Sequence, residues 1–158
     1  MKQTIFILED SSLVANLVKH SLEETFNCEV SIFFTERELM LNMLRKPALV
    51  ILDYHLEDNK TGMEALINLR KFDPKLPVVF FSGQTLIHYT KLVSEHTHYV
   101  DKNNDDFLSD LIKTCSRELK KSSLKNALDK IKAKQEKSAK ALIALVSIMT
   151  ALSASLFL

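Results

Sequence analysis

The segment from Ala48 to Asp53 constrains the fold more than any other, because five apolar residues in a row end in a single carboxylate. A run that is apolar on both faces is typical of a strand buried on both sides, as in a parallel sheet covered by helices. In such sheets the chemistry lies at the carboxyl ends of the strands. Asp53 stands at that end, and we take it as the centre of a candidate site.

The rest of the first 120 residues repeats a pattern of strand followed by helix. The expected strands are residues 4–8, 28–34, 48–52, 78–81 and 99–100. The expected helices cover about residues 12–26, 36–44, 61–72, 86–95 and 105–119. Short connections between alternating strands and helices predict a parallel sheet with right-handed crossovers and helices on both faces.

The charge of the chain is divided unevenly, although its formal net charge is only +1. Residues 1–116 carry a net charge of −5, and residues 117–158 carry a net charge of +6. A nucleic-acid reader carries its basic charge on the folded surface, so this distribution argues against nucleic-acid binding. Cys28 and Cys115 lack metal-type spacing and are expected to pack as small apolar residues in a reducing compartment, the cytoplasm.

Four expected strands are followed by groups that suit phosphoryl chemistry: Glu9 and Asp10, Asp53, Ser82 and Lys102. Because parallel strands bring their carboxyl ends to one edge, we expect these groups to share a pocket. Three crowded carboxylates resist joint ionisation unless a cation lies among them, and oxygen ligands suit Mg²⁺. A lysine and a hydroxyl suit the stabilisation of phosphoryl oxygens. The pattern therefore predicts that Asp53 is a nucleophile that accepts a phosphoryl group.

Taken singly, each of these residues has an ordinary explanation. An Asp at the end of a strand often forms a turn, and Glu9 and Asp10 precede a helix whose dipole favours acids. Only the coincidence of four groups at four strand ends favours a site.

The chain resembles the receiver domain of two-component response regulators over about residues 1–121. The matching pieces are Glu9-Asp10, Asp53, Ser82-Gly83, Tyr99 and Lys102. The resemblance implies an α/β fold of the flavodoxin-like, doubly wound type, with a five-stranded parallel sheet in the order 2-1-3-4-5. A helical extension would follow this domain at its C-terminus.

The resemblance also implies roles for the residues at the strand ends. Asp53 would accept phosphate from a phosphohistidine on a sensor histidine kinase or phosphotransfer protein. Asp10, Asp53 and the backbone carbonyl of His55 would bind Mg²⁺, and Glu9 would support the ion through water. Lys102 would pair with the acyl phosphate.

The same resemblance implies a switch that acts on an unknown downstream protein. The Ser82 hydroxyl would move to the phosphate and the Tyr99 ring would swing inward, which remodels the surface over residues 83–100. The chain would be a phosphoacceptor with self-catalysed phosphotransfer, and not an enzyme with a separate substrate. A receiver-like interaction module that signals without phosphate is the first alternative, and an aspartyl-nucleophile phosphatase is the second.

Three positions depart from the usual family pattern. Glu57 stands where a proline is common, and Gly62 follows Asp53 by nine residues, one more than is usual. Asn103 follows Lys102 where the family often has proline, which argues against the cis peptide common there. These differences concern loop geometry and phosphate lifetime, because no reacting group is removed.

The C-terminal residues are expected to form a basic helical linker, 122–140, and a hydrophobic helix, 141–158. The apolar stripe of the linker, Leu124, Leu128 and Ile131, is interrupted at Lys134 and Ser138. Residues 141–158 carry no charge, and 18 helical residues span about 27 Å, near the hydrocarbon thickness of a bilayer. We therefore expect a transmembrane anchor that tethers a cytoplasmic domain to the inner membrane.

A different partner for the C-terminal helix is also open at this stage. Ser147, Ala151 and Ser155 form a stripe of small residues that permits close approach of two helices, and hence a homodimer. A helix whose apolar end packs in a dimer or against another protein is the alternative to the anchor.

Overall fold

The protein is a five-stranded α/β sandwich followed by a helical extension, as seen in a computed structural model that describes residues 2–56, 61–83 and 96–155. All strand pairings are parallel, and the strand order is β2-β1-β3-β4-β5. The strands are β1 (Gln3–Leu8), β2 (Cys28–Phe33), β3 (Leu49–Asp53), β4 (Val78–Ser82) and β5 (Thr97–Asp101). The predicted flavodoxin-like sheet and its strand order are confirmed.

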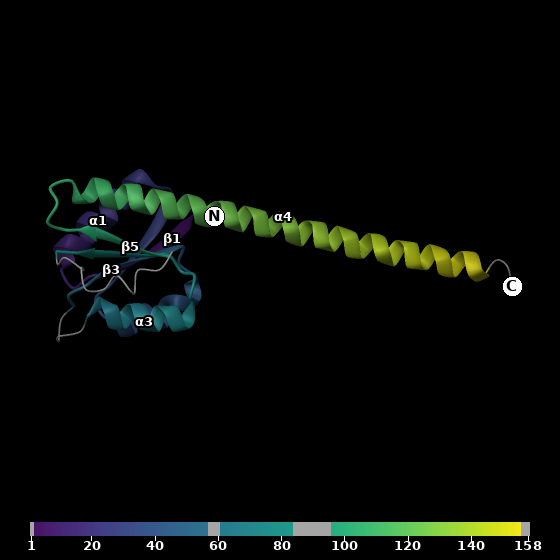
Figure 1. Cartoon of the computed structure of the whole chain (residues 1–158), viewed down its shortest axis with the longest axis horizontal. Helices are drawn as coiled ribbons and strands as arrows, with labels where there is room; N and C mark the ends of the chain where they lie inside the picture. Colours follow the sequence, from purple (N-terminus) through teal and green to yellow (C-terminus); the bar gives the residue numbers. More distant parts are fainter. Residues whose placement is uncertain (1, 57–60, 84–95, 156–158) are drawn as a thin grey trace. The chain divides into compact units, whose positions relative to one another are not determined.

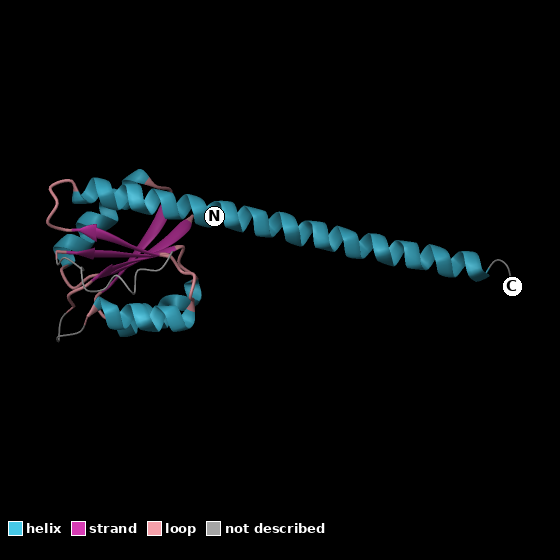
Figure 2. Cartoon of the chain, viewed as in Figure 1, coloured by secondary structure: helices cyan, strands magenta, loops and turns pink. Residues whose placement is uncertain are grey.

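Helices cover both faces of this sheet (Figures 1 and 2). They are α1 (Ser12–Thr25), α2 (Glu36–Asn42) with a 3₁₀ turn η1 (Met43–Arg45), α3 (Gly62–Phe72) and α4 (Phe107–Ser155). Local chemistry sets two helix starts, because the hydroxyls of Ser11 and Thr35 accept hydrogen bonds from backbone N–H groups of the first turns of α1 and α2. The predicted helix over 86–95 lies outside the described residues.

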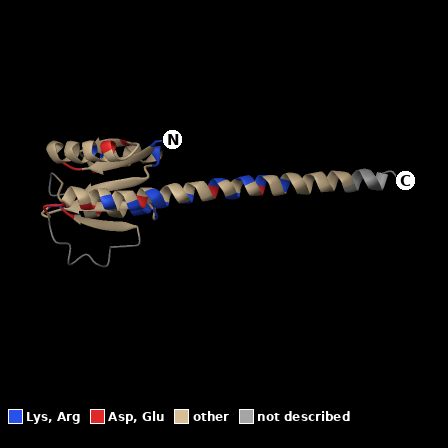
Figure 3. Ribbon diagram, turned by 90° about the horizontal axis from the view of Figure 1, so that it is seen from above, with Lys and Arg blue, Asp and Glu red and all other residues tan. Residues whose placement is uncertain are grey.

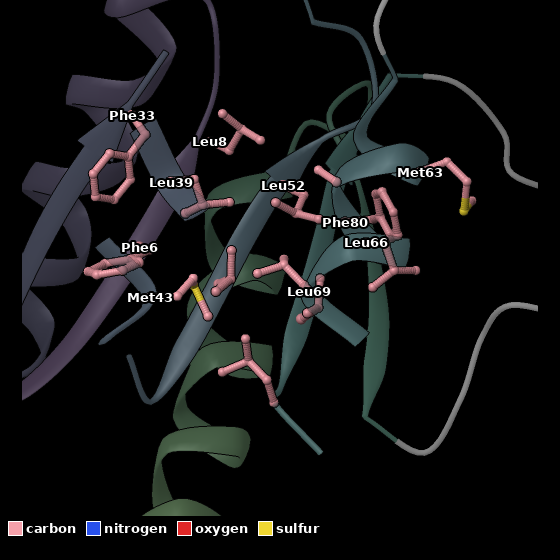
Figure 4. Packing of buried hydrophobic residues seen from close by; sticks show 14 of the residues in the cluster. Phe6, Leu8, Phe33, Leu39, Met43, Leu52, Met63, Leu66, Leu69 and Phe80 are labelled. Carbon is pink, nitrogen blue, oxygen red and sulfur yellow. The ribbon is translucent and has the colours of Figure 1, made fainter. Parts of the chain in front are cut away.

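The core has two halves, one on each face of the sheet. Strand β3 shows why, since its alternate side chains point to opposite faces. Val50 and Leu52 join a cluster with residues of α2 and α3 (Figure 4). Leu49 and Ile51 join a second cluster with residues of α1 and of the first turns of α4. Because β3 is the central strand and is buried on both faces, its carboxyl end, which carries Asp53, has a well-supported position where the strands end.

The chain divides into two compact units, residues 1–120 and 121–158. The first unit is the sandwich. The second is the continuation of α4, in which the described apolar side chains are exposed. Helix α4 is continuous across the predicted linker and into the predicted hydrophobic helix.

The expectation of a transmembrane anchor over residues 141–158 is not supported. Within the part of the chain that the structure describes, no helix holds a stretch long and apolar enough to cross a bilayer. The side chains of residues 150–158 are not among those described, and they include Ala151 and Ser155 of the small-residue stripe. The expected tether to the inner membrane is likewise unsupported.

Candidate functional site

The candidate site lies at the carboxyl edge of the central strands. Glu9 and Asp10 follow β1, Asp53 ends β3, Ser82 ends β4 and Lys102 follows β5. These four strands are neighbours in the sheet in the order β1-β3-β4-β5. The structure therefore brings together residues that lie far apart in the sequence, as the strand pattern predicted.

Three carboxylates form the acidic part of the site. Glu9, Asp10 and Asp53 each offer one oxygen, and these oxygens all lie within 4.8 Å of one another. Glu9 and Asp53 are buried, with exposed fractions of 3% and 7%, whereas Asp10 is partly exposed. The cluster is thus open on the side of Asp10 and closed behind it.

Lys102 connects two of these carboxylates. Its Nζ lies 2.6 Å from Glu9 Oε2 and 2.8 Å from Asp53 Oδ2. The backbone N–H of Lys102 donates to the carbonyl of Ser82 at 2.9 Å, and its ammonium lies 4.9 Å from the centre of the Phe81 ring. The lysine is therefore fixed at both its backbone and its side chain, with its positive charge against Asp53.

The surroundings of Glu9 raise its pKa to about 7. Burial and the charge of Asp53 act to raise this pKa, while the hydrogen bond and charge of Lys102 act to lower it. One lysine does not fully offset three carboxylates. The donor set fits a small hard divalent cation, because it consists of oxygens alone and places them close together.

The two residues of the predicted switch lie next to this cluster. Ser82 is fully buried at the end of β4. The Tyr99 hydroxyl donates to the backbone carbonyl of Ser82 at 3.1 Å, and Tyr99 packs against the core cluster that includes residues of α3. Burial raises the pKa of the Tyr99 hydroxyl, and the charge of Asp101 adds to the shift. The surface predicted to change, residues 83–100, falls largely outside the described residues.

Gly62 contributes to the site in a way that the sequence did not reveal. A Cβ atom at Gly62 would lie 2.0 Å from the backbone oxygen of Asp53, so only glycine fits. The Gly62 N–H also donates to the carbonyl of Tyr54 at 2.8 Å, and His55 pairs with Thr61 in a short antiparallel bridge. The start of α3 is thus packed directly against the backbone of Asp53. Glu57 lies outside the described residues.

Asn103 replaces the proline that the family often carries, and it has its own contact. Its side-chain amide donates to the carbonyl of Gly83, and its backbone N–H donates to Asp101 Oδ1 at 2.8 Å. The described residues contain no cis peptide bond, as expected from the absence of proline. The loop that carries Lys102 is therefore tied to the end of β4 by a side chain.

The family model of the response regulator receiver domain matches residues 5–113. The chain belongs to this family. No curated protein sequence matches it. Among solved structures, the receiver protein from Sinorhizobium medicae WSM419 is 16% identical, with a TM-score of 0.66, and covers 77% of this chain and 97% of that chain. The CheY-like receiver from Methanospirillum hungatei JF-1 is 20% identical, with a TM-score of 0.67, and covers 79% of this chain and 99% of that chain.

A longer protein also contains this fold. NtrX from Brucella abortus is 24% identical, with a TM-score of 0.69, and covers 83% of this chain but only 30% of that chain. These likenesses show the fold of the receiver domain.

Proposed function

We propose that this receiver domain accepts a phosphoryl group on Asp53 from the phosphohistidine of a sensor histidine kinase or phosphotransfer protein. The observation that carries the proposal is the position of Lys102 Nζ, 2.8 Å from Asp53 Oδ2, beside two further carboxylates. A buried carboxylate with a fixed cation at its oxygen is prepared for the charge of an incoming phosphoryl group.

In the transfer, an oxygen of Asp53 forms a bond to phosphorus while the bond between phosphorus and the donor's imidazole nitrogen breaks. The electron pair of that bond returns to the imidazole, so no oxidant or further reactant is needed. Lys102 moves from the Asp53 carboxylate to an oxygen of the phosphoryl group, and its ion pair with Glu9 holds it at the correct depth.

Mg²⁺ would be held by Asp10, Asp53 and the backbone carbonyl of His55, with Glu9 supporting it through water. When bound, the ion supplies positive charge that neutralises the phosphoryl oxygens. The protein's own contribution is to keep Asp10 partly exposed for this ion and to keep Glu9 buried behind Lys102.

We further propose that phosphorylation acts on a downstream protein through Ser82 and Tyr99, without a nucleic-acid partner. The Ser82 hydroxyl donates to the phosphate, and Tyr99 loses its hydrogen bond to the Ser82 carbonyl as that residue moves. This role makes the chain a phosphoacceptor and not an enzyme that turns over a separate substrate. A phosphatase is less well supported, because His55 stands where such enzymes carry a second Asp.

Incubation with acetyl phosphate and Mg²⁺, followed by intact mass, tests the proposal. We expect the wild-type chain to gain the mass of one phosphoryl group, Asp53→Asn to gain none, and chelation of Mg²⁺ to prevent the gain. Asp73→Asn is the matched control, because Asp73 is an exposed carboxylate at the end of α3. Absence of phosphate on the wild type would favour the receiver-like module that signals without it. Turnover of a phosphomonoester would favour the phosphatase.

A further inference from the structure

The extension of α4 exposes a row of large apolar side chains that the receiver fold does not use. Nine large apolar residues of the described extension are at least half exposed. Six of them form the row: Leu124 71%, Leu128 50%, Ile131 56%, Leu142 64%, Leu145 58% and Met149 62%. The other three, Ile143, Val146 and Ile148, lie off this row. Exposed rows of this kind are uncommon on a soluble helix unless they are covered by a partner.

The spacing of the row identifies its geometry. With Gln135 and Ser138 included, the intervals from Leu124 to Met149 alternate strictly between four residues and three. This is the 3.5-residue period of a heptad repeat, which keeps one seam of a helix against another helix over its whole length. The two central seam positions are thus polar, Gln135 and Ser138, and Lys134, which seemed to interrupt the stripe, lies beside the seam.

The rest of the helix surface agrees with this seam. The positions directly opposite it are Asn126, Ala133, Lys140 and Ser147, and none of them is a large apolar residue. Among the outer positions that flank these four, only Ile143 is a large apolar residue. Glu136 and Lys140 form an ion pair at 2.8 Å on the outer side of the helix. Figure 3 shows basic residues along the middle of the extension, and none of these lysines falls on the seam itself.

We propose that residues 124–149 pair with the same segment of a second copy of this chain as a parallel coiled coil. In a parallel pair, the residue just before Leu128 or Gln135 lies opposite the residue five positions later in the partner helix. Lys132 then lies opposite Ala127, and Lys134 lies opposite Ala139, so no two lysines of the segment face each other across the seam. Gln135 meets Gln135 of the second copy, and two amides can donate to and accept from each other.

A partner of different chemistry explains the pattern less well. An acidic protein would be expected to meet lysines along the contact, whereas the seam from Leu124 to Met149 carries no charge. Attachment to a lipid surface would use all exposed apolar residues alike. It would not require intervals that alternate between four and three residues. A second copy satisfies both observations, because each seam residue meets its own equivalent.

Adjacent residues allow a matched test in the full-length chain. Leu142 and Ile143 are exposed to 64% and 66%, but Leu142 is on the seam, whereas Ile143, one heptad after Glu136, is on the outer side. By sedimentation velocity over a concentration series, we expect the wild type to form a species of twice the 18.0 kDa chain mass. Leu142→Lys should raise the dissociation constant by about 100-fold or more, and Ile143→Lys by about threefold at most. Equal effects of the two substitutions, a monomeric wild type, or a trimer would overturn the proposal.

Disulfide formation tests the orientation and remains informative if a charged variant misfolds. In a parallel pair, Ile131→Cys places two thiols at the seam within bonding reach, whereas Ala133→Cys places them on the outer faces. The native Cys28 and Cys115 thiols are buried, and burial raises the pKa of both, that of Cys115 to about 12. We expect Ile131→Cys to form a covalent dimer under mild oxidation and Ala133→Cys and wild type to remain monomeric on a non-reducing gel. No covalent dimer from Ile131→Cys, or equal amounts from both variants, would overturn the parallel arrangement.

Discussion

The two parts of helix α4 use their apolar residues differently. In the first part, Leu111, Cys115 and Leu119 are spaced four apart and are almost completely buried against the sheet. In the second part, from Leu124 to Met149, the intervals alternate between four and three and the apolar side chains are exposed. One continuous helix therefore carries two patterns. The first matches a short contact with the chain's own sheet, and the second matches a long contact with another helix.

The largest expected effect comes from truncating one apolar residue in each part. Leu111→Ala should lower the free energy of unfolding by about 3 kcal/mol, because it leaves a cavity in the core. Leu128→Ala, at a half-exposed position, should change it by less than about 0.5 kcal/mol in the monomer. Urea unfolding, measured at a protein concentration too low for self-association, compares the two. Similar losses from both variants would mean that Leu128 is buried by the chain's own receiver domain.

Inside the receiver domain, the two glycines Gly62 and Gly83 allow a second comparison, between a contact with backbone and a contact with a side chain. Gly62→Ala should cost about 2 kcal/mol of unfolding free energy, since its Cβ would lie 2.0 Å from the Asp53 backbone oxygen. Gly83→Ala should cost less than about 1 kcal/mol, because the atoms nearest to its Cβ would belong to a side chain, that of Asn103, at 3.2 Å and not to backbone. Urea unfolding and the rate of Asp53 phosphorylation measure the pair. A loss from Gly62→Ala as small as that from Gly83→Ala would show that α3 can shift away from Asp53 at little cost.

The sequence predicted the sheet well, because its evidence is local and repeated. A buried strand such as β3 can be recognised by its apolar run. The parallel strand order then places Asp10, Asp53 and Lys102 together at the carboxyl ends of the strands. The contacts of Gly62 and Asn103 could not be predicted, since a close approach between backbones depends on how a loop closes. A glycine and an asparagine give no periodic signal of such a contact.

The expected transmembrane anchor rested on composition alone, and the described residues do not support it. Residues 141–158 are apolar and uncharged, which alone suggests a membrane span. The heptad spacing becomes visible only when the segment is joined to Leu124, Leu128 and Ile131 as one continuous helix. Dividing the sequence by composition separated residues that a single helix places in one row.

Titration should also distinguish the receiver domain from the extension of α4, because the buried carboxylates among the described residues all belong to the receiver domain. The pKa of Glu9 is raised to about 7 in the folded chain, from an ordinary value of 4.5. A folded state that binds a proton more tightly than the unfolded state is stabilised as pH falls. Glu9 therefore contributes stability that is fully present below pH 4.5 and is lost as pH rises through about 7.

Thermal unfolding without metal at about pH 5.5 and about pH 8 measures this contribution. We expect the wild type to lose more stability than Glu9→Gln between the two conditions. Added Mg²⁺ should stabilise the wild type more at the higher pH, because the ion competes with the proton for the carboxylates. An identical pH response in Glu9→Gln would assign the change to another group.

The smallest expected effect concerns the outer side of the extension. Glu136 and Lys140 form an exposed ion pair four residues apart, and such pairs stabilise a helix by about 0.3–0.5 kcal/mol. Glu136→Gln should lower the thermal midpoint of the extension only slightly, as measured by circular dichroism, and the difference should vanish at high salt, since exposed charges are screened. Because Glu136 lies off the seam, the dissociation constant should change by less than about threefold. A loss of self-association as large as that of Leu142→Lys would place the contact on the opposite face of α4 and refute the heptad assignment.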